Sequence, residues 1–144
     1  MTAVQMAARR ARWLRAVGYG LFAEISTIVT IIVVMLLYRF VFARGLAEAD
    51  YNAFGERAGA LVGIVAGTLY TYVFARRLMP KVTSRFVTHA IVVALAAIAL
   101  SISGSIAGHQ GVPVGYLLAS ALKLVAGALA GFLYTRSAVR NRTV

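Results

Sequence analysis

Four long apolar runs occupy most of the chain, and short polar segments separate them. A helix needs roughly 20 apolar residues to cross a hydrocarbon core of about 30 Å. The four runs meet that length at 16–39, 57–77, 86–107 and 113–135. The glycines and the proline between the last two runs are typical of a tight turn. The pattern therefore predicts an all-α membrane protein, folded as a four-transmembrane-helix antiparallel bundle.

The residues outside the four runs form only short segments. A basic arm covers 1–15 and a tail covers 136–144, so we expect a single integral membrane domain over 1–144. The first run follows basic residues, as the apolar part of a secretory signal peptide does. Its length of more than 20 residues exceeds the roughly 7–15 that are usual in such a peptide. We therefore interpret it as a retained membrane anchor.

Lysine and arginine are distributed unevenly among the polar segments. Eleven lie in the arm, in the loop between the second and third runs, and in the tail, whereas three lie in the loop after the first run. The eleven are Arg9, Arg10, Arg12, Arg15, Arg76, Arg77, Lys81, Arg85, Arg136, Arg140 and Arg142, and the three are Arg39, Arg44 and Arg57. Short loops rich in these residues stay in the cytoplasm. We therefore expect both termini on the cytoplasmic side of a bacterial-type inner, or plasma, membrane.

The composition supports a lipid environment. Hydrophobic residues make up 61% of the chain and charged residues 13%, whereas roughly a quarter of the residues of a soluble domain are charged. The net charge of +11 does not indicate a nucleic-acid partner, because the basic residues form short clusters between apolar runs rather than one solvated face. We expect part of the arm to contact anionic lipid headgroups, where each basic residue contributes about 1 kcal/mol. The residues concerned are Arg9, Arg10, Arg12 and Trp13.

Two charged residues lie inside the predicted spans, Glu24 in the first and Lys123 in the fourth. A charge in the bilayer centre costs about 2.5–3.5 kcal/mol even on insertion scales, and such charges are usually paired. Glu24 is about 10 Å from the cytoplasmic end of its span and Lys123 is near the midplane, a gap that a lysine side chain can bridge. We therefore predict a buried Glu24–Lys123 ion pair that fixes the register of the first and fourth spans.

The same two charges support a second interpretation. A histidine of the third span and threonines of the first and second spans are expected at a similar depth. The resulting polar cluster is Glu24, Thr27, Thr68, Thr71, His89 and Lys123. Ionisable side chains inside a membrane often form proton relays. The cluster therefore suits a proton-coupled small transporter or channel, with Glu24 as the carboxylate that binds the proton or substrate.

The segment around Glu24 also carries a local resemblance. Residues Tyr19–Ile25, which read YGLFAEI, resemble the first-span segment of small multidrug resistance transporters. In that family a membrane-embedded glutamate after an alanine binds protons and cationic substrates in turn. The chain departs from the family in its greater length, its intramembrane lysine and the lack of tryptophan in its later spans. The resemblance implies only that Glu24 can exchange a proton.

Small residues recur at helical spacing in the second and fourth spans. The second span has a glycine at every fourth position, which is the pattern of a glycine zipper, and the fourth has two glycines at the same spacing. These residues are Gly55, Gly59, Gly63, Gly67, Gly127 and Gly131. Close backbone approach through small residues is a main source of helix association in lipid. We favour packing within one chain, and the alternative is an interface with a second copy or a partner membrane protein.

Signals for catalysis are weak. Ser120 and Lys123 have the S-x-x-K spacing of serine-lysine acylating enzymes, but they lie in mid-helix with no oxyanion hole in view. The chain has no cysteine, which excludes disulfides and thiolate metal sites. His89 and His109 are expected on opposite sides of the membrane and cannot share a metal. We therefore expect no enzymatic activity and no cofactor, and we favour a small inner-membrane protein that acts through helix packing as an accessory, scaffold or oligomeric subunit.

Overall fold

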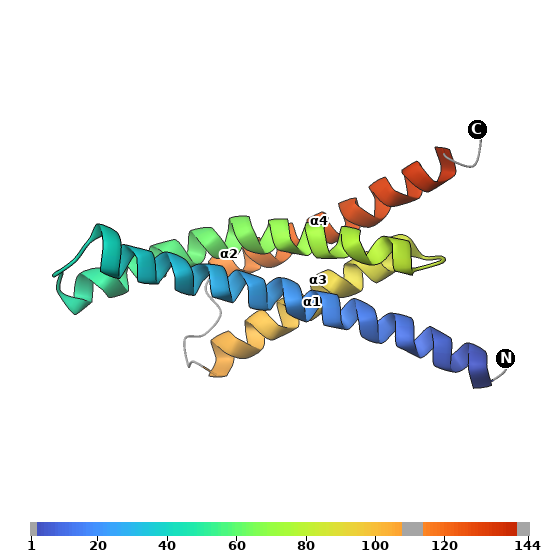
Figure 1. Ribbon diagram of the computed structural model, residues 1–144, viewed down its shortest axis with the longest axis horizontal. Helices are drawn as coiled ribbons and strands as arrows, with labels where there is room; N and C mark the ends of the chain where they lie inside the picture. Colours follow the sequence, from blue (N-terminus) through green and yellow to red (C-terminus); the bar gives the residue numbers. More distant parts are fainter. Residues whose placement is uncertain (1–2, 108–113, 141–144) are drawn as a thin grey trace.

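The computed structural model describes residues 3–107 and 114–140, and all regular structure in them is helical (Figure 1). The long helices are α1 (Ala3–Leu37), α2 (Glu48–Leu78), α3 (Phe86–Ala107) and α4 (Val114–Arg140). A π-helical turn, η1 (Tyr38–Phe42), continues α1, and a 3-10 turn, η2 (Met79–Lys81), follows α2. All four long helices have the length and composition to cross a membrane. The prediction of an all-helical fold with four candidate spans is confirmed.

Three of the helices are longer than the spans that apolar residues alone predict, and α4 is one of them, since it continues past 135 to Arg140. α1 starts at Ala3 because the alanines and arginines of the arm favour helix. α2 starts at Glu48, where Glu48 and Asp50 place negative charge at the positive end of the helix dipole. α3 begins and ends at the predicted residues. The turn predicted at 108–113 lies outside the described residues.

Tyr51 organises the connection between α1 and α2. Its hydroxyl donates a hydrogen bond to the Ala43 carbonyl oxygen at 2.6 Å and accepts one from the Leu46 N–H at 3.2 Å. Gly45 lies between these residues with a φ of +82°, a left-handed conformation that glycine adopts without a steric cost. The connection is therefore tight, and α2 returns alongside α1 (Figure 1).

The four helices form a ring whose neighbours do not follow chain order. α1 packs against α2 and α3, and α4 packs against the same two helices. α1 and α4 are therefore diagonally opposite. Successive helices run in opposite directions (Figure 1). A contact between α1 and α4 thus requires side chains that meet across the interior.

α3 is approached closely by the helices on both sides of it. Gly20 of α1 lies directly against the α3 backbone. A Cβ atom added at Gly127 of α4 would lie 2.8 Å from the Ala90 carbonyl oxygen, and one added at Gly131 would lie 2.6 Å from the Val87 Cα. Because real Cβ atoms do not come so close to backbone, these three positions require glycine. They bring α1 and α4 against α3 through small residues, as expected of helices in lipid.

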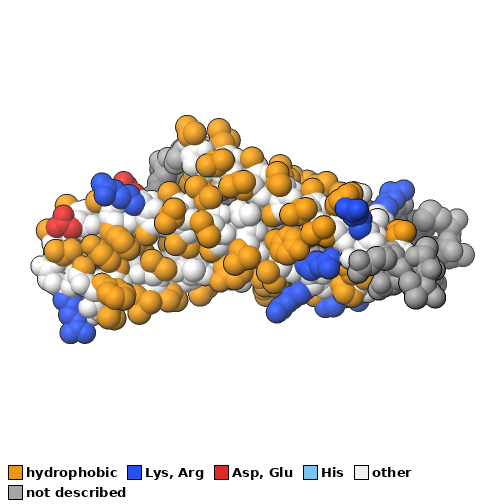
Figure 2. All heavy atoms as spheres, turned by 90° about the horizontal axis from the view of Figure 1, so that it is seen from above, with side chains coloured by type: hydrophobic (Ala, Val, Ile, Leu, Met, Phe, Trp, Pro, Cys, Tyr) orange, Lys and Arg blue, Asp and Glu red, His pale blue; other side chains and the backbone are white. Residues whose placement is uncertain are grey.

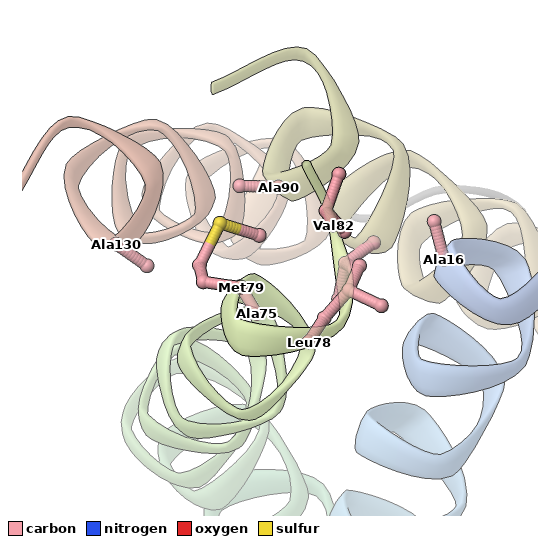
Figure 3. Close-up of a cluster of buried hydrophobic side chains, with 8 residues drawn as sticks. Ala16, Ala75, Leu78, Met79, Val82, Ala90 and Ala130 are labelled. Carbon is pink, nitrogen blue, oxygen red and sulfur yellow. The ribbon is translucent and has the colours of Figure 1, made fainter. Parts of the chain in front are cut away.

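A dense apolar cluster occupies the end of the bundle that holds η2, which we call the η2 end (Figure 3). Leu78 and Met79 are fully buried there. The cluster draws on all four helices and consists of Ala16, Ala75, Leu78, Met79, Val82, Ala90, Val93 and Ala130. α2 ends just before Pro80, which has no N–H to continue the helix. The chain then turns across the η2 end of the bundle, and the loop into α3 contributes to the core.

The face of the molecule in Figure 2 carries hydrophobic side chains along most of its length. Large hydrophobic side chains are exposed on every helix, for example Phe22, Leu61, Leu95 and Phe132. Soluble proteins rarely expose apolar surface of this extent, whereas a surface facing lipid consists of it. With the four candidate spans, it indicates a multi-pass membrane protein.

The glycines of α2 do not form the continuous ridge that their spacing predicts. Gly55 contacts a methionine side chain of α1, and Gly67 contacts the side chain of Lys123. A Cβ atom added at Gly59 or Gly63 would meet nothing within 4 Å. The prediction of intramolecular packing along the whole ridge is therefore wrong for its two central glycines. A period of four places the glycines on one face of α2, but each neighbouring helix meets that face only locally.

Candidate functional site

The two intramembrane charges predicted from the sequence meet in the interior of the bundle. The Nζ atom of Lys123 lies 2.5 Å from the Oε2 atom of Glu24, and the ammonium group donates a hydrogen bond to the carboxylate. Glu24 is 4% exposed and Lys123 is 3% exposed. Because α1 and α4 are diagonally opposite in the ring, this ion pair joins two helices that do not otherwise pack as neighbours. The predicted Glu24–Lys123 ion pair is present.

Glycine and threonine make room for the ion pair. A Cβ atom added at Gly67 of α2 would lie 2.8 Å from the Lys123 Cε and 3.6 Å from the Thr27 Cγ2. Gly67 therefore leaves the space in which the lysine stem crosses the interior. On the opposite side, Gly20 and Gly127 are one helical turn from Glu24 and Lys123 and bring α3 into contact. All four helices thus enclose the two charges.

The three threonines of the predicted cluster differ in their hydrogen bonding. Thr27 and Thr71 are buried, and their hydroxyl groups donate to the carbonyl oxygens one turn earlier, those of Ala23 at 3.0 Å and Gly67 at 2.7 Å. The hydroxyl oxygen of Thr68 is buried and has no hydrogen-bond partner in the described part of the chain. Two of the hydroxyls are therefore satisfied by their own helices, and only that of Thr68 is free to bind something else.

His89 does not join the cluster. Its ring stacks on the Trp13 ring at 4.2 Å between centroids, with 16° between the planes, and its Nδ1 is 3.0 Å from the Arg85 carbonyl oxygen. Trp13 precedes Glu24 by about 16 Å along α1, at 1.5 Å per residue. The prediction that His89 shares the layer of Glu24 is therefore wrong. The prediction counted the depth of His89 from the start of its own span and the depth of Glu24 from the start of the first span. The contact between α1 and α3 instead places His89 beside Trp13.

The ion pair lies at the boundary of the buried interior. No residue of α1 beyond Thr27 is buried, and none of α4 before Lys123. On α2 only Tyr51 is buried ahead of Gly67. We call the part from the ion pair to the η2 end the closed half; it comprises 16–27, 67–82, 86–98 and 123–131. The open half comprises 28–42, 48–66, 99–107 and 114–122, and in these ranges only Tyr51 and Ser105 are buried.

The residues expected to contact lipid headgroups are only partly free to do so. Trp13 is stacked on His89, and the Arg12 guanidinium donates a hydrogen bond to the Thr83 hydroxyl at 2.6 Å. Arg10 is exposed. The side chain of Arg9 lies outside the described residues. The final turns of the arm are therefore tied to α3 and to the loop before it, which the sequence did not reveal.

Arg76 and Tyr134 form a contact that the sequence analysis missed. The Arg76 guanidinium carbon lies 5.5 Å from the centre of the Tyr134 ring, a cation–π contact between the last turn of α2 and α4. Its Nη1 atom is buried and has no hydrogen-bond partner in the described part of the chain. Counting basic residues for topology treats Arg76 like its exposed neighbour Arg77. Only its position one turn after the half-buried Tyr72 hints at a different environment.

The arrangement leaves little scope for catalysis at Lys123. Its amine is bound to Glu24 and is not available to take a proton from Ser120. Within residues 3–107 and 114–140, no three histidine or acidic side chains are grouped so that they could hold a metal ion. The chemistry that the site offers is electrostatic, since one carboxylate and one ammonium group neutralise each other away from solvent.

No protein-family model, curated protein or solved structure matches this chain.

Proposed function

We propose that this chain is a multi-pass protein of a bacterial-type inner membrane, with both termini cytoplasmic, that acts through helix packing as an accessory, scaffold or oligomeric subunit. The observation that carries the proposal is the enclosed Glu24–Lys123 ion pair. A carboxylate that exchanges protons or substrate needs access to a water-filled path. Glu24 is instead 4% exposed and bound to an ammonium group of its own chain, an arrangement suited to holding α1 and α4 in place.

The open half supports a role in assembly. Its helices present exposed apolar side chains such as Ile32, Leu61 and Leu117. On the same half of α2, Gly59 and Gly63 face open space, so another helix can approach its backbone closely. Small residues on an unoccupied face are typical of helix interfaces in lipid. The partner on this face is a second copy or another membrane protein.

A matched pair of substitutions tests the assembly role. Gly63→Leu places a bulky side chain on the open face of α2, at a position where no atom lies within 4 Å of an added Cβ. Gly104→Leu does the same on α3, where Gly104 is also open. We expect Gly63→Leu to reduce the size of the complex extracted from native membranes in mild detergent, and Gly104→Leu to leave it unchanged. A wild-type chain that is monomeric and partner-free would contradict the proposal.

A proton-coupled transporter or channel is the second candidate, and the unpartnered Thr68 hydroxyl favours it. A buried hydroxyl without a partner can bind a water molecule or an ion. This function requires that purified protein in liposomes move protons along an imposed gradient and that Glu24→Gln abolish the movement. Equal proton flux in wild-type and empty liposomes would exclude it.

A further inference from the structure

The hairpin that α1 and α2 form projects beyond the end of α3 (Figure 1). α1 and α3 run in the same direction, and Trp13 lies beside His89. Ala107, the last residue of α3, follows His89 by 18 residues and is therefore level with about Ile31. The helix formed by α1 and η1 continues to Phe42. At 1.5 Å per residue, it extends about 15 Å farther than α3.

The projecting part of the hairpin reaches past the hydrocarbon core. α3 has 22 residues, and its length of about 33 Å matches a core of about 30 Å. α4 starts near the level at which α3 ends, because Val114 precedes Lys123 by nine residues and Lys123 meets Glu24. The headgroup layer adds only about 5–7 Å on each side. The tip of the hairpin therefore lies beyond the lipid tails.

Contacts within the tip hold it in one conformation. Tyr38 stacks on Phe54 with 3.5 Å between ring centroids, and the Tyr51 ring meets Tyr38 edge-on at 6.3 Å. Arg39 forms an ion pair with Glu48 at 2.6 Å, and its guanidinium carbon lies 5.0 Å from the centre of the Tyr51 ring. A surface that is already ordered loses little conformational entropy when it binds a partner.

Large apolar side chains are exposed on this ordered tip. Phe40 is 59% exposed and Phe42 is 78% exposed. Four further apolar residues of the tip are also exposed, namely Leu36, Leu37, Val41 and Leu46. Within the hydrocarbon core lipid would cover such residues, whereas beyond it a group of exposed apolar side chains is typical of a protein interface. The tip therefore favours a protein partner.

The charges of residues 36–57, which we call the hairpin end, are balanced. They are three cations and three anions, Arg39, Arg44, Arg57, Glu48, Asp50 and Glu56. Among these six, the ion pairs of the described residues include only Arg39–Glu48. Arg44 and Arg57 remain as exposed cations, and Asp50 and Glu56 as exposed anions. A surface of one sign, such as anionic headgroups, would attract two of these groups and repel the other two. A complementary partner carries both signs.

We propose that the hairpin end binds the hairpin end of a second copy of this chain. A second copy offers the same apolar side chains and an equal number of both charges, so the surface is complementary to itself, as a two-fold interface requires. Copies with one orientation in the membrane place their hairpin ends at the same height. The inference rests on the assembly role and the membrane placement of the proposed function, and it names the partner.

Disulfide cross-linking of single-cysteine variants in native membranes tests the contact, because the chain has no cysteine of its own. Phe40→Cys and Phe22→Cys are matched, since the two phenylalanines are similarly exposed and lie about five turns apart on nearly the same side of one helix. Leu117→Cys, exposed on the outer part of α4, controls for access of the oxidant. We expect Phe40→Cys to give at least about fivefold more covalent dimer than either control, because a disulfide needs Cα atoms within about 7 Å.

Charge variants in the Phe40→Cys background test the complementarity. Asp50→Asn/Glu56→Gln leaves the hairpin end with unpaired cations, and Arg44→Gln/Arg57→Gln leaves it with unpaired anions. We expect each variant alone to form about fivefold less covalent dimer, because like charges then face each other. Two differently tagged chains, one of each variant, should recover the cross-link as a mixed dimer when they are expressed together.

Equal cross-linking at Phe40→Cys and at the controls would overturn the inference. A mixed dimer no more abundant than the dimers of each charge variant would also overturn it. If the charge variants do not insert, the cysteine comparison decides alone. A complex that holds one copy of this chain and a different protein would reject the second copy and leave the assembly role standing, whereas a monomeric, partner-free chain would contradict both.

Discussion

The closed and open halves of the bundle both contain apolar residues and glycines, and they differ in packing. Gly63 and Gly67 are one turn apart on the same face of α2. The side chain of Lys123 lies against Gly67, whereas nothing lies within 4 Å of the Cβ position at Gly63. The closed half thus contains the dense apolar cluster and the ion pair, and the open half leaves small and apolar residues unpaired. The difference teaches that a glycine pattern marks a surface for close approach, while the neighbouring helix decides whether it is used.

The ion pair explains where the change from closed to open occurs. Glu24 and Lys123 belong to α1 and α4, which are diagonally opposite in the ring. Their ion pair joins these two helices at one level along the bundle. Toward the η2 end of this level, glycines on α1 and α4 bring both helices against α3. Away from it, α1 and the described part of α4 bury no residue. This arrangement is consistent with a subunit that is stable through its closed half and that binds a partner through its open half.

The largest effect is expected from removing one charge of the ion pair. Lys123→Met leaves the Glu24 carboxylate enclosed without a partner, which typically costs about 3–5 kcal/mol of unfolding free energy. Lys81→Met removes a lysine from the exposed surface and should cost less than about 1 kcal/mol. Reversible unfolding in bicelles measures both. If Lys123→Met and Lys81→Met lowered the unfolding free energy by similar amounts, the charge in the interior would be no more important for stability than the charge on the surface, which would contradict this prediction.

An intermediate effect is expected from adding a methyl group to the glycines of each half. Gly131→Ala places a Cβ atom 2.6 Å from the Val87 Cα in the closed half, and overpacking of this kind costs about 1–3 kcal/mol. Gly59→Ala adds the same atom to open space and should be neutral or stabilising by up to about 1 kcal/mol, because alanine favours helix. Thermal unfolding of the two variants should therefore shift in opposite directions or in one variant only. A similar loss in both would show that the open half is packed.

The smallest effect is expected at the aromatic contact that ties α1 to α3. Trp13→Leu removes the ring stacked on His89, and aromatic pairs contribute about 0.5–1.5 kcal/mol beyond the area they bury. Trp13→Phe keeps a ring and should recover most of the loss. If the leucine variant were as stable as the wild type, the contact between Trp13 and His89 would not contribute to the stability of the closed half. The same unfolding measurement resolves the two variants.

Much of the fold could be predicted because it depends on local composition. The length of an apolar run determines whether a helix can span a membrane, and α3 begins and ends at the predicted residues. The partnership of Glu24 and Lys123 was also predictable, since two opposite charges inside an apolar bundle have few other partners. The longer extents of α1, α2 and α4 could not be predicted, because helix continues through polar residues that no apolar pattern marks.

The errors concern how helices meet. His89 was assigned to the layer of Glu24 by counting depth along each span, but the register between α1 and α3 depends on where Gly20 contacts the α3 backbone. The face formed by Gly59 and Gly63 was predicted, and its lack of a neighbour was not. Arg76 was missed because its burial arises from the contact with Tyr134, a residue on another helix. Such contacts are properties of the assembled bundle.

The most direct test of the structural role of the ion pair replaces both charges together. We predict that the double variant Glu24→Met/Lys123→Met has an unfolding free energy within about 1 kcal/mol of the wild type, while Lys123→Met alone is less stable by about 3–5 kcal/mol, because an apolar pair of similar volume can replace a buried ion pair. The double variant should also form a complex of wild-type size. A double variant as unstable as the single one, or a single variant as stable as the wild type, would contradict the account.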